Sequence, residues 1–256
     1  MPGQIDKVLV VIPALEPSPR FLELLKSLRE YLGKQENSNI SANILVVDDG
    51  SSAEYRHIFR QAQEMYNCTV LRHAVNFGKG RALKTAFNYY LNECNDFAGL
   101  VTADSDGQHA AGDIIKCINE LSGCSSLILG CRDFSKKNVP VKNKIGNKIT
   151  RNVFAFFCGI KVTDTLTGLR AIPAELVNEM IVIPGERFEY EMNMLIECSN
   201  KKIKIKEVLI ETIYPENNHS SHFNKVLDSI RVYKTFIKYI ISALSSFLLD
   251  IPQHPK

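Results

Sequence analysis

Short apolar runs alternate with amphipathic stretches through the first half of the chain, and this alternation limits the folds that the chain can adopt. The runs are rich in β-branched residues, as is typical of strands buried on both faces of a parallel sheet. They are Lys7–Ile12, Ile44–Val47, Cys68–Leu71, Leu100–Ala103 and Ser126–Gly130. The intervening stretches have helical spacing of apolar residues. The pattern predicts an α/β fold with a Rossmann-like, mostly parallel sheet flanked by helices.

Composition limits the compartment and the partners. With 256 residues and 45% apolar content, the chain can form a full-sized core. A net charge of +3 is too small for a dedicated nucleic-acid binder, so no nucleic-acid partner is expected. The seven cysteines are scattered without Cys-x-x-Cys spacing, which favours a reducing compartment over a zinc site or disulfides. We expect neither a secretory signal nor a membrane span, because no apolar run approaches about 20 residues.

Two acidic residues follow the fourth of these strands. Asp104 and Asp106 are one residue apart, and Gln108 comes shortly after them. Unpaired carboxylates this close repel each other, so a cation is expected beside them. Hard ions such as Mg²⁺ and Mn²⁺ take oxygen ligands and keep positions open for phosphate oxygens. The motif predicts a metal-assisted site for a phosphate-bearing substrate, although an isolated Asp-x-Asp would fit a polar turn equally well.

Three polar segments are expected at one edge of the sheet. In open α/β sheets the ligand lies beyond the carboxyl ends of the strands. Residues 13–16, Asp48 with Asp49, and residues 104–108 all follow predicted strands. Solvated turns do not readily explain three such segments, so their convergence predicts a ligand site at this edge.

Seven motifs together resemble one known family. They are Val-Val-Ile-Pro-Ala-Leu-Glu (10–16), Val-Val-Asp-Asp-Gly-Ser-Ser (46–52), Asn-Phe-Gly-Lys-Gly-Arg-Ala-Leu (76–83), Ala-Asp-Ser-Asp-Gly-Gln-His (103–109), Gly-Cys-Arg (130–132), Asp-Thr-Leu-Thr-Gly-Leu-Arg-Ala (164–171) and Arg-Phe-Glu-Tyr-Glu-Met (187–192). In this order they resemble the family 2 glycosyltransferases, most closely the polyprenyl-phosphate branch related to dolichyl-phosphate mannose synthase. The resemblance implies a GT-A fold and an inverting hexose transfer from a UDP- or GDP-linked sugar, with Mg²⁺ or Mn²⁺.

The resemblance also implies a donor site. It assigns the nucleotide sugar to Pro13, Leu15, Glu16, Asp48, Asn76, Lys79, Asp104 and Ser105. The first four would surround the base and ribose, and the glycine-containing loop at 76–80 would approach the donor closely. Ala14-Leu15 departs from the Thr-Tyr that is commoner in the family, so aromatic stacking on the base is in doubt. Taken alone, Asp48 would fit an Asx turn and Lys79 a solvated loop lysine.

By the same resemblance, Asp104, Asp106 and Gln108 would bind the metal and the donor diphosphate. The metal would neutralise charge on the leaving diphosphate. A competing interpretation is a phosphatase-type Asp-x-Asp-Gly motif, with Asp104 as a covalent nucleophile. That motif normally follows the first strand, whereas this one follows the fourth.

A basic stripe follows the fifth strand and suggests the acceptor. The predicted helix 143–157 carries Lys144, Lys148 and Arg151 on one side, opposite several apolar residues. A lipid phosphate is already ionised at neutral pH, so as a nucleophile it needs cations rather than a general base. A solvated helix face is the alternative. We expect the acceptor phosphate at Arg132, Lys148 and Arg151, and catalytic roles for Asp106, Arg132 and Arg151. We also expect Asp164 to orient Arg170 or Arg151.

The chain divides into a predicted catalytic domain, residues 1–223, and an amphipathic juxtamembrane helix with a tail, residues 224–256. Helix 225–249 mixes basic and apolar positions, and its uncharged run is too short to cross a bilayer. It therefore predicts attachment to the cytoplasmic face of a membrane, either peripheral or through segments beyond this chain. Packing on the domain or on a second copy, giving a homo-oligomer, is the alternative.

Two other functions are open at this point. A family 2 enzyme of polysaccharide or wall-polymer assembly would use a saccharide hydroxyl as acceptor, and it would need a general base. Glu189 and Glu191 are the nearby candidates for that base. A catalytically inactive domain that only binds nucleotide is the third interpretation, and the intact set of Asp104, Asp106 and Gln108 argues against it.

Overall fold

The computed structural model describes residues 6–34, 40–135, 139, 141–211 and 213. The predicted helix 225–249 and the domain boundary at residue 223 lie outside the described residues. All seven cysteines lie inside them as free thiols, which confirms the absence of a disulfide framework. In this part of the chain no helix is long and apolar enough to cross a membrane.

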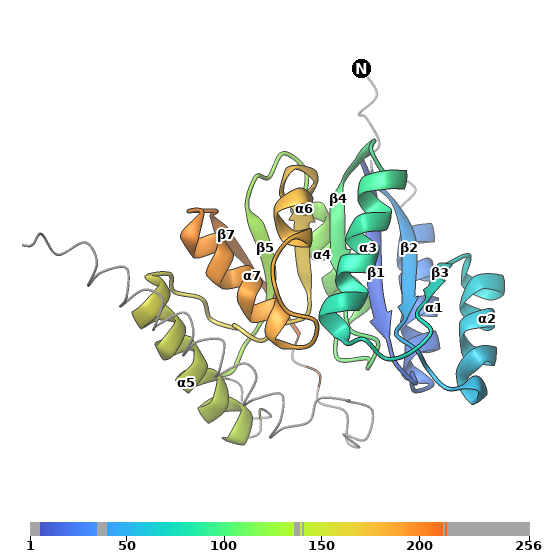
Figure 1. Cartoon of the computed structure of the whole chain (residues 1–256), viewed down its shortest axis with the longest axis horizontal. Helices are drawn as coiled ribbons and strands as arrows, with labels where there is room; N and C mark the ends of the chain where they lie inside the picture. Colours follow the sequence, from blue (N-terminus) through green and yellow to red (C-terminus); the bar gives the residue numbers. More distant parts are fainter. Residues whose placement is uncertain (1–5, 35–39, 136–138, 140, 212, 214–256) are drawn as a thin grey trace, which may run out of the picture.

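Seven strands form one sheet. Figure 1 shows this sheet together with the helices that pack on it. They are β1 (Asp6–Ala14), β2 (Ile40–Asp48), β3 (Thr69–Arg72), β4 (Phe97–Thr102), β5 (Leu127–Arg132), β6 (Arg170–Pro173) and β7 (Ile205–Ile210). Their order is β3-β2-β1-β4-β6-β5-β7. Only β6 is antiparallel to its neighbours, β4 and β5. The mostly parallel α/β sheet predicted from the sequence is therefore confirmed.

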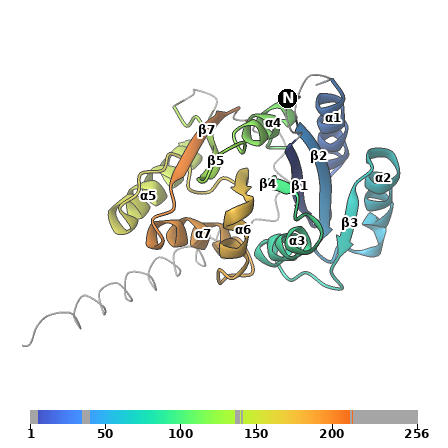
Figure 2. The same cartoon turned by 90° about the horizontal axis from the view of Figure 1, so that it is seen from above.

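Helices cover both faces of the sheet, as the view from above shows (Figure 2). One face carries α1 (Arg20–Lys34), α2 (Arg56–Tyr66) and α4 (Ala111–Asn119); the other carries α3 (Lys79–Glu93), α6 (Ala174–Ile181) and α7 (Glu189–Asn200), with α5 (Val141–Cys158) beside α7. Each face has its own apolar core, and the strand residues alternate between the two. The sequence analysis did not predict α6.

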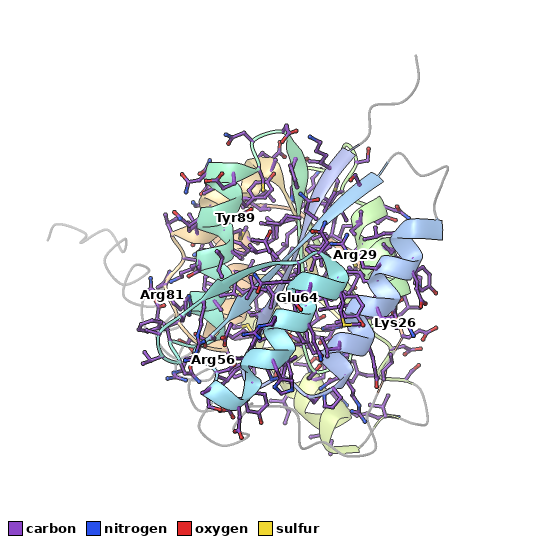
Figure 3. All side chains as sticks on the ribbon, turned by 90° about the vertical axis from the view of Figure 1, so that its right-hand side faces the viewer. Lys26, Arg29, Arg56, Glu64, Arg81 and Tyr89 are labelled. Carbon is purple, nitrogen blue, oxygen red and sulfur yellow. The ribbon has the colours of Figure 1, made fainter. Side chains whose placement is uncertain are left out.

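The outer surface of α1 to α3 is charged and exposed, with Lys26, Glu64 and Arg81 on it (Figure 3). Between α1 and α2, Arg29 has a structural role. Its guanidinium donates hydrogen bonds of 2.7 and 2.8 Å to the carbonyl oxygens of Tyr66 and Asn67 at the end of α2. These bonds satisfy carbonyls that a helix end leaves without partners, and they fix α2 against α1.

The register of the sheet brings distant segments to one edge. Ala14 pairs with Asp48, and Thr102 pairs with Val11, so the segments that follow β1, β2 and β4 meet. Because β6 runs in the opposite direction, the segment before it, residues 164–169, arrives at the same edge. The predicted convergence of residues 13–16, 48–49 and 104–108 is confirmed, and it includes a late segment that was not predicted to join them.

Helix α5 buries Phe154 in the core but exposes several of its other apolar residues. Ile145, Ile149 and Phe156 are 54%, 48% and 81% exposed, whereas Asn147 and Thr150 are buried. The buried polar groups form short-range bonds: Asn147 Nδ2 donates to the Thr163 carbonyl at 2.8 Å, and Thr150 donates to the Gly146 carbonyl at 2.9 Å. The side that contacts the domain thus combines these polar residues with Phe154 and Val153, and most of the apolar side identified in the sequence lies outside it.

Candidate active site

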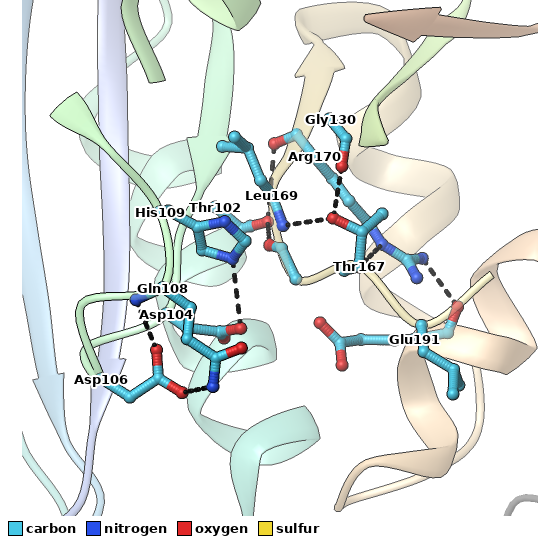
Figure 4. A network of polar contacts seen from close by, with 12 residues as sticks. Thr102, Asp104, Asp106, Gln108, His109, Gly130, Thr167, Leu169, Arg170 and Glu191 are labelled. Atoms are coloured by element: carbon cyan, nitrogen blue, oxygen red, sulfur yellow. Dashed lines mark hydrogen bonds and ion pairs between the residues drawn. The ribbon is translucent and has the colours of Figure 1, made fainter. Parts of the chain in front are cut away.

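The acidic pair lies in the segment that leaves β4 (Figure 4). Gln108 holds the Asp106 carboxylate through its backbone N–H at 3.0 Å and its side-chain amide at 2.7 Å. Asp104 packs against Gly168, where an added Cβ would lie 2.4 Å from Asp104 Oδ2. Thr102 fixes this approach by donating a hydrogen bond of 2.8 Å to the Gly168 carbonyl. The acidic motif and the segment before β6 therefore form one unit.

Lys79, at the first turn of α3, is bound to the acidic motif. Its Nζ lies 2.6 Å from Asp104 Oδ1 and 2.8 Å from Glu191 Oε1. On the other side of Asp104, His109 Nε2 is 3.3 Å from Oδ2. The Lys79 side chain is only 13% exposed, so the interpretation of Lys79 as a solvated loop lysine was wrong. Its contact with the donor remains a prediction.

The pKa values of the two aspartates diverge. Burial opposes ionisation of Asp104, but the Lys79 ammonium and the hydrogen bond from His109 outweigh it and hold the pKa of Asp104 well below its usual range. Burial raises the pKa of Asp106, and the neighbouring Asp104 charge raises it further. Lys79 neutralises Asp104, and Asp106 is left without an equivalent cation.

The residues present fit a hard divalent cation. Asp104, Asp106 and Gln108 offer oxygen donors from one short segment, and the raised pKa of Asp106 marks a position where added positive charge would be favourable. Within the described ranges, no three His, Cys, Asp or Glu side chains group closely enough to hold an ion alone. Mg²⁺ suits such a sparse site, because proteins often bind it through one or two carboxylates plus substrate phosphates.

The four residues predicted to surround the base and ribose lie together at the carboxyl ends of β1 and β2. Asp48 is buried, and its carboxylate accepts a hydrogen bond of 2.8 Å from the Ser51 N–H. Arg72 Nε lies 3.4 Å from its other oxygen. Glu16 has a left-handed backbone, with φ 44°, and its N–H donates to Ser51 Oγ at 2.8 Å. Pro13 lies near the end of β1, and Leu15 follows that strand directly. The ends of β1 and β2 are thereby joined.

Asp49, which the sequence analysis placed at the sheet edge without a role of its own, organises the glycine-containing loop. Its carboxylate accepts hydrogen bonds from the N–H groups of Phe77 at 3.0 Å and Gly78 at 2.8 Å, and His73 Nδ1 lies 2.7 Å away. Gly78 has φ 107°, and a Cβ there would lie 2.5 Å from the Glu186 carbonyl oxygen. Gly78 is therefore in close contact with the backbone of Glu186 in the same chain. Asn76 is exposed on the same loop.

Arg132 forms a bidentate ion pair at the end of β5. Its Nε and NH2 donate to the two oxygens of Asp164 at 2.7 and 3.1 Å, and Asp164 is fully buried. The expectation that Asp164 orients Arg170 or Arg151 was therefore wrong. Arg170 is buried elsewhere, where it donates to the backbone carbonyls of Glu191 at 2.7 Å and Thr167 at 3.1 Å.

Three basic residues of α5, Lys144, Lys148 and Arg151, lie on or near the surface of the helix. Lys148 is exposed, and Lys144 and Arg151 are half-buried. Among the described residues, no carboxylate forms an ion pair with any of the three. Their role in binding an acceptor phosphate remains a prediction, whereas Arg132 is already neutralised in part by Asp164.

Residues 9–180 match the family model described as Glycosyl transferase family 2. The chain belongs to this family. It is 30% identical over 240 residues to the uncharacterized protein MJ1222 of Methanocaldococcus jannaschii, covering 92% of this chain and 93% of that protein. It is 27% identical over 262 residues to the UDP-N-acetylglucosamine–dolichyl-phosphate N-acetylglucosaminyltransferase of Methanococcus voltae, covering 95% and 99% of the two chains.

A solved structure supports the fold. Glucosyl-3-phosphoglycerate synthase from Mycobacterium tuberculosis, in complex with Mn²⁺, UDP and glucosyl-3-phosphoglycerate, aligns with a TM-score of 0.61 at 18% identity. The alignment covers 93% of this chain and 79% of that one. The predicted GT-A fold is confirmed.

Proposed function

We propose that this glycosyltransferase moves a hexose from a nucleotide-diphosphate sugar to a polyprenyl phosphate with inversion at the anomeric carbon. An oxygen of the lipid phosphate attacks C1 of the sugar. The bond from C1 to the donor diphosphate breaks, and its electron pair leaves with the nucleoside diphosphate. The relative in Methanococcus voltae, whose name includes a dolichyl-phosphate acceptor, supports this acceptor class.

On the donor side, the joined ends of β1 and β2 would hold the nucleotide through Pro13, Leu15, Glu16 and Asp48. Asp104, Asp106 and Gln108 would hold Mg²⁺ or Mn²⁺ next to the diphosphate, and Ser105 and Asn76 would complete the donor site. When bound, the metal would stabilise negative charge on the departing diphosphate. The convergence of these segments at one sheet edge supports this arrangement.

The observation that supports the acceptor assignment is how the two candidate bases, Glu189 and Glu191, are bonded within the chain. Glu191 is bound to Lys79 at 2.8 Å, and Glu189 Oε1 accepts hydrogen bonds from the backbone N–H groups of Glu186 at 3.1 Å and Arg187 at 3.2 Å. A saccharide hydroxyl needs a base to take its proton, and an ionised phosphate does not. Lys79 thus occupies Glu191, and Glu189 has one bonded oxygen and one that is buried without a partner among the described residues. The bonding of Glu191 and the burial of Glu189 favour a phosphate acceptor, with Arg132, Lys148 and Arg151 as its cations.

We also propose that the enzyme works at a membrane, because a polyprenyl acceptor resides in one, and that it acts on the cytoplasmic face. Exposed apolar side chains and exposed basic side chains share α5, the helix that follows Arg132 in the chain. A surface of this composition suits a bilayer that contains anionic lipids, because the apolar groups enter the headgroup boundary and the cations contact phosphates.

The function can be tested with radiolabelled UDP- and GDP-linked sugars, Mn²⁺ or Mg²⁺, and a short-chain polyprenyl phosphate. We expect a labelled lipid that mild acid cleaves, and no product from the matching polyprenol, which lacks the phosphate. The anomeric configuration of the product, read by NMR, tests inversion. A labelled saccharide with no labelled lipid from any donor would favour the polysaccharide enzyme instead.

A further inference from the structure

Lys79 links two carboxylates that the proposed chemistry uses differently. Its Nζ is 2.6 Å from Asp104, a proposed metal ligand, and 2.8 Å from Glu191 on α7. The side chains of Lys79 and Glu191 are 13% and 9% exposed, so water screens this contact weakly. When Asp106 is ionised, three carboxylates share one ammonium. The group then has an excess of two negative charges, which one divalent cation would balance.

We propose that Lys79 is a resident counter-ion of Asp104, which the divalent cation displaces, and that Glu191 retains the displaced ammonium. This inference rests on the proposed metal site. In the metal-free protein the ammonium balances Asp104 and keeps the motif folded. When the metal binds to Asp104, the ammonium loses that partner and keeps Glu191. The Lys79 side chain needs only a small movement, because both carboxylates are already within hydrogen-bonding distance.

The surroundings of Glu191 suit this role. Arg170 holds the first turn of α7 by donating to the Glu191 carbonyl at 2.7 Å, so the Glu191 side chain starts from a fixed backbone. The Phe188 ring lies 5.7 Å from Lys79 Nζ and offers a second favourable contact for the ammonium. A lysine carries three N–H donors and rotates freely at its end, so it can exchange partners without leaving its site.

The proposal makes a prediction about metal affinity that is independent of turnover. Mn²⁺ binding to the nucleotide-free protein, measured by electron paramagnetic resonance, should become about tenfold tighter or more in Lys79→Met, because a competing cation is gone. Lys84→Met is the matched control. Lys84 lies on the same helix with the same 13% exposure, but it pairs with Glu186 at 3.1 Å and does not contact Asp104. Its Mn²⁺ affinity should equal that of the wild type.

Glu191→Gln should act in the opposite direction and weaken Mn²⁺ binding several-fold, because the displaced ammonium loses its second partner. In the Lys79→Met background the same substitution should have no effect. If Glu191→Gln weakens binding equally in both backgrounds, Glu191 supports the metal directly and the proposal is wrong. Unchanged or weaker binding in Lys79→Met also overturns it.

A measurement on the unmodified chain guards against a variant that fails to fold. During a titration with Mg²⁺, the side-chain NMR signals of Lys79 should shift and those of Lys84 should stay in place. If Mg²⁺ binds but the Lys79 signals do not shift, the proposed displacement of Lys79 is wrong, whereas the proposed metal site remains. Absence of Mg²⁺ and Mn²⁺ binding in both the wild type and Lys79→Met would instead remove the metal site and this inference with it.

Discussion

The sheet edge that carries the candidate site has a proposed donor end and a proposed acceptor end. The two ends differ in whether their charged side chains have partners among the described residues. At the donor end, beyond β1, β2 and β4, charged groups find partners inside the chain: Ser51 and Arg72 contact Asp48, and Lys79 contacts Asp104. At the acceptor end, α5 exposes Phe156 and other apolar residues, and its basic residues have no carboxylate partner within the described part of the chain.

The difference indicates that the donor end is organised by contacts within the chain, whereas the acceptor end has exposed apolar side chains among the described residues. Preorganised polar groups lose little energy to rearrangement when charge develops during a reaction. An exposed apolar face, by contrast, gains stability only when another surface covers it. The predictions below test this difference, beginning with the largest expected effect.

Asp106→Asn should lower transfer by about 100-fold or more, because it removes a charge beside the leaving diphosphate. Burial raises the pKa of Asp106, so its ionised form costs folding free energy at neutral pH. Removing the charge should therefore leave the melting temperature unchanged or raised. Assays of turnover and thermal unfolding check both effects. Asp96→Asn, at the other end of β4, is the control and should keep activity. Full activity in Asp106→Asn would remove this residue from catalysis.

Arg132→Ala should raise the KM for polyprenyl phosphate about tenfold, through loss of a charge-assisted contact, while nucleotide-sugar affinity stays the same. It should also lower the free energy of unfolding by about 3 kcal/mol, because Asp164 is left buried and unpaired. Steady-state kinetics and denaturant unfolding measure the two effects. Equal losses for both substrates would place Arg132 on the donor side.

The double variant Arg132→Ala with Asp164→Asn separates binding from structure at this pair. Neutralising Asp164 should recover most of the lost stability, because no buried charge remains unpaired. The raised KM for the lipid should persist. Recovery of both properties would mean that Arg132 only stabilises the segment at residues 164–169.

Phe156→Ser should weaken binding to vesicles that contain anionic lipids about 30-fold, because one buried aromatic side chain contributes about 2 kcal/mol. Its folding stability should be unaffected, since Phe156 is 81% exposed. Val182→Ser, at a position 74% exposed beside the end of α6, is the control. Vesicle sedimentation measures binding. An unchanged affinity together with a changed oligomeric state would identify a second copy as the partner of α5.

Local sequence patterns predicted the parallel strands and the convergence of the segments that follow them. Runs of β-branched residues located the parallel strands, and the rule that ligands lie at their carboxyl ends placed Asp48 and Asp104 together. These properties depend on residues that are close in sequence, or on a general feature of parallel sheets. The fold and most of the donor edge could therefore be read without a structure.

The pairings across the site could not be predicted in the same way. The contact of Lys79 with Glu191 and that of Arg132 with Asp164 join residues far apart in the chain, and no local pattern specifies such partners. The orientation of α5 could also not be predicted from the sequence, because a helix with apolar residues on one side is normally expected to bury them. A short antiparallel strand such as β6 has too few residues to show a period.

The position of β6 has a consequence for how the protein folds during synthesis. β5 has only β6 and β7 as neighbours in the sheet, and both follow it in the chain. Until residues 170–173 leave the ribosome, β4 keeps one edge unpaired and β5 has no partner. Unpaired strand edges are sites of aggregation. We expect fragments that end before β6 to be captured by chaperones, and nascent chains to become protease-resistant in one late step.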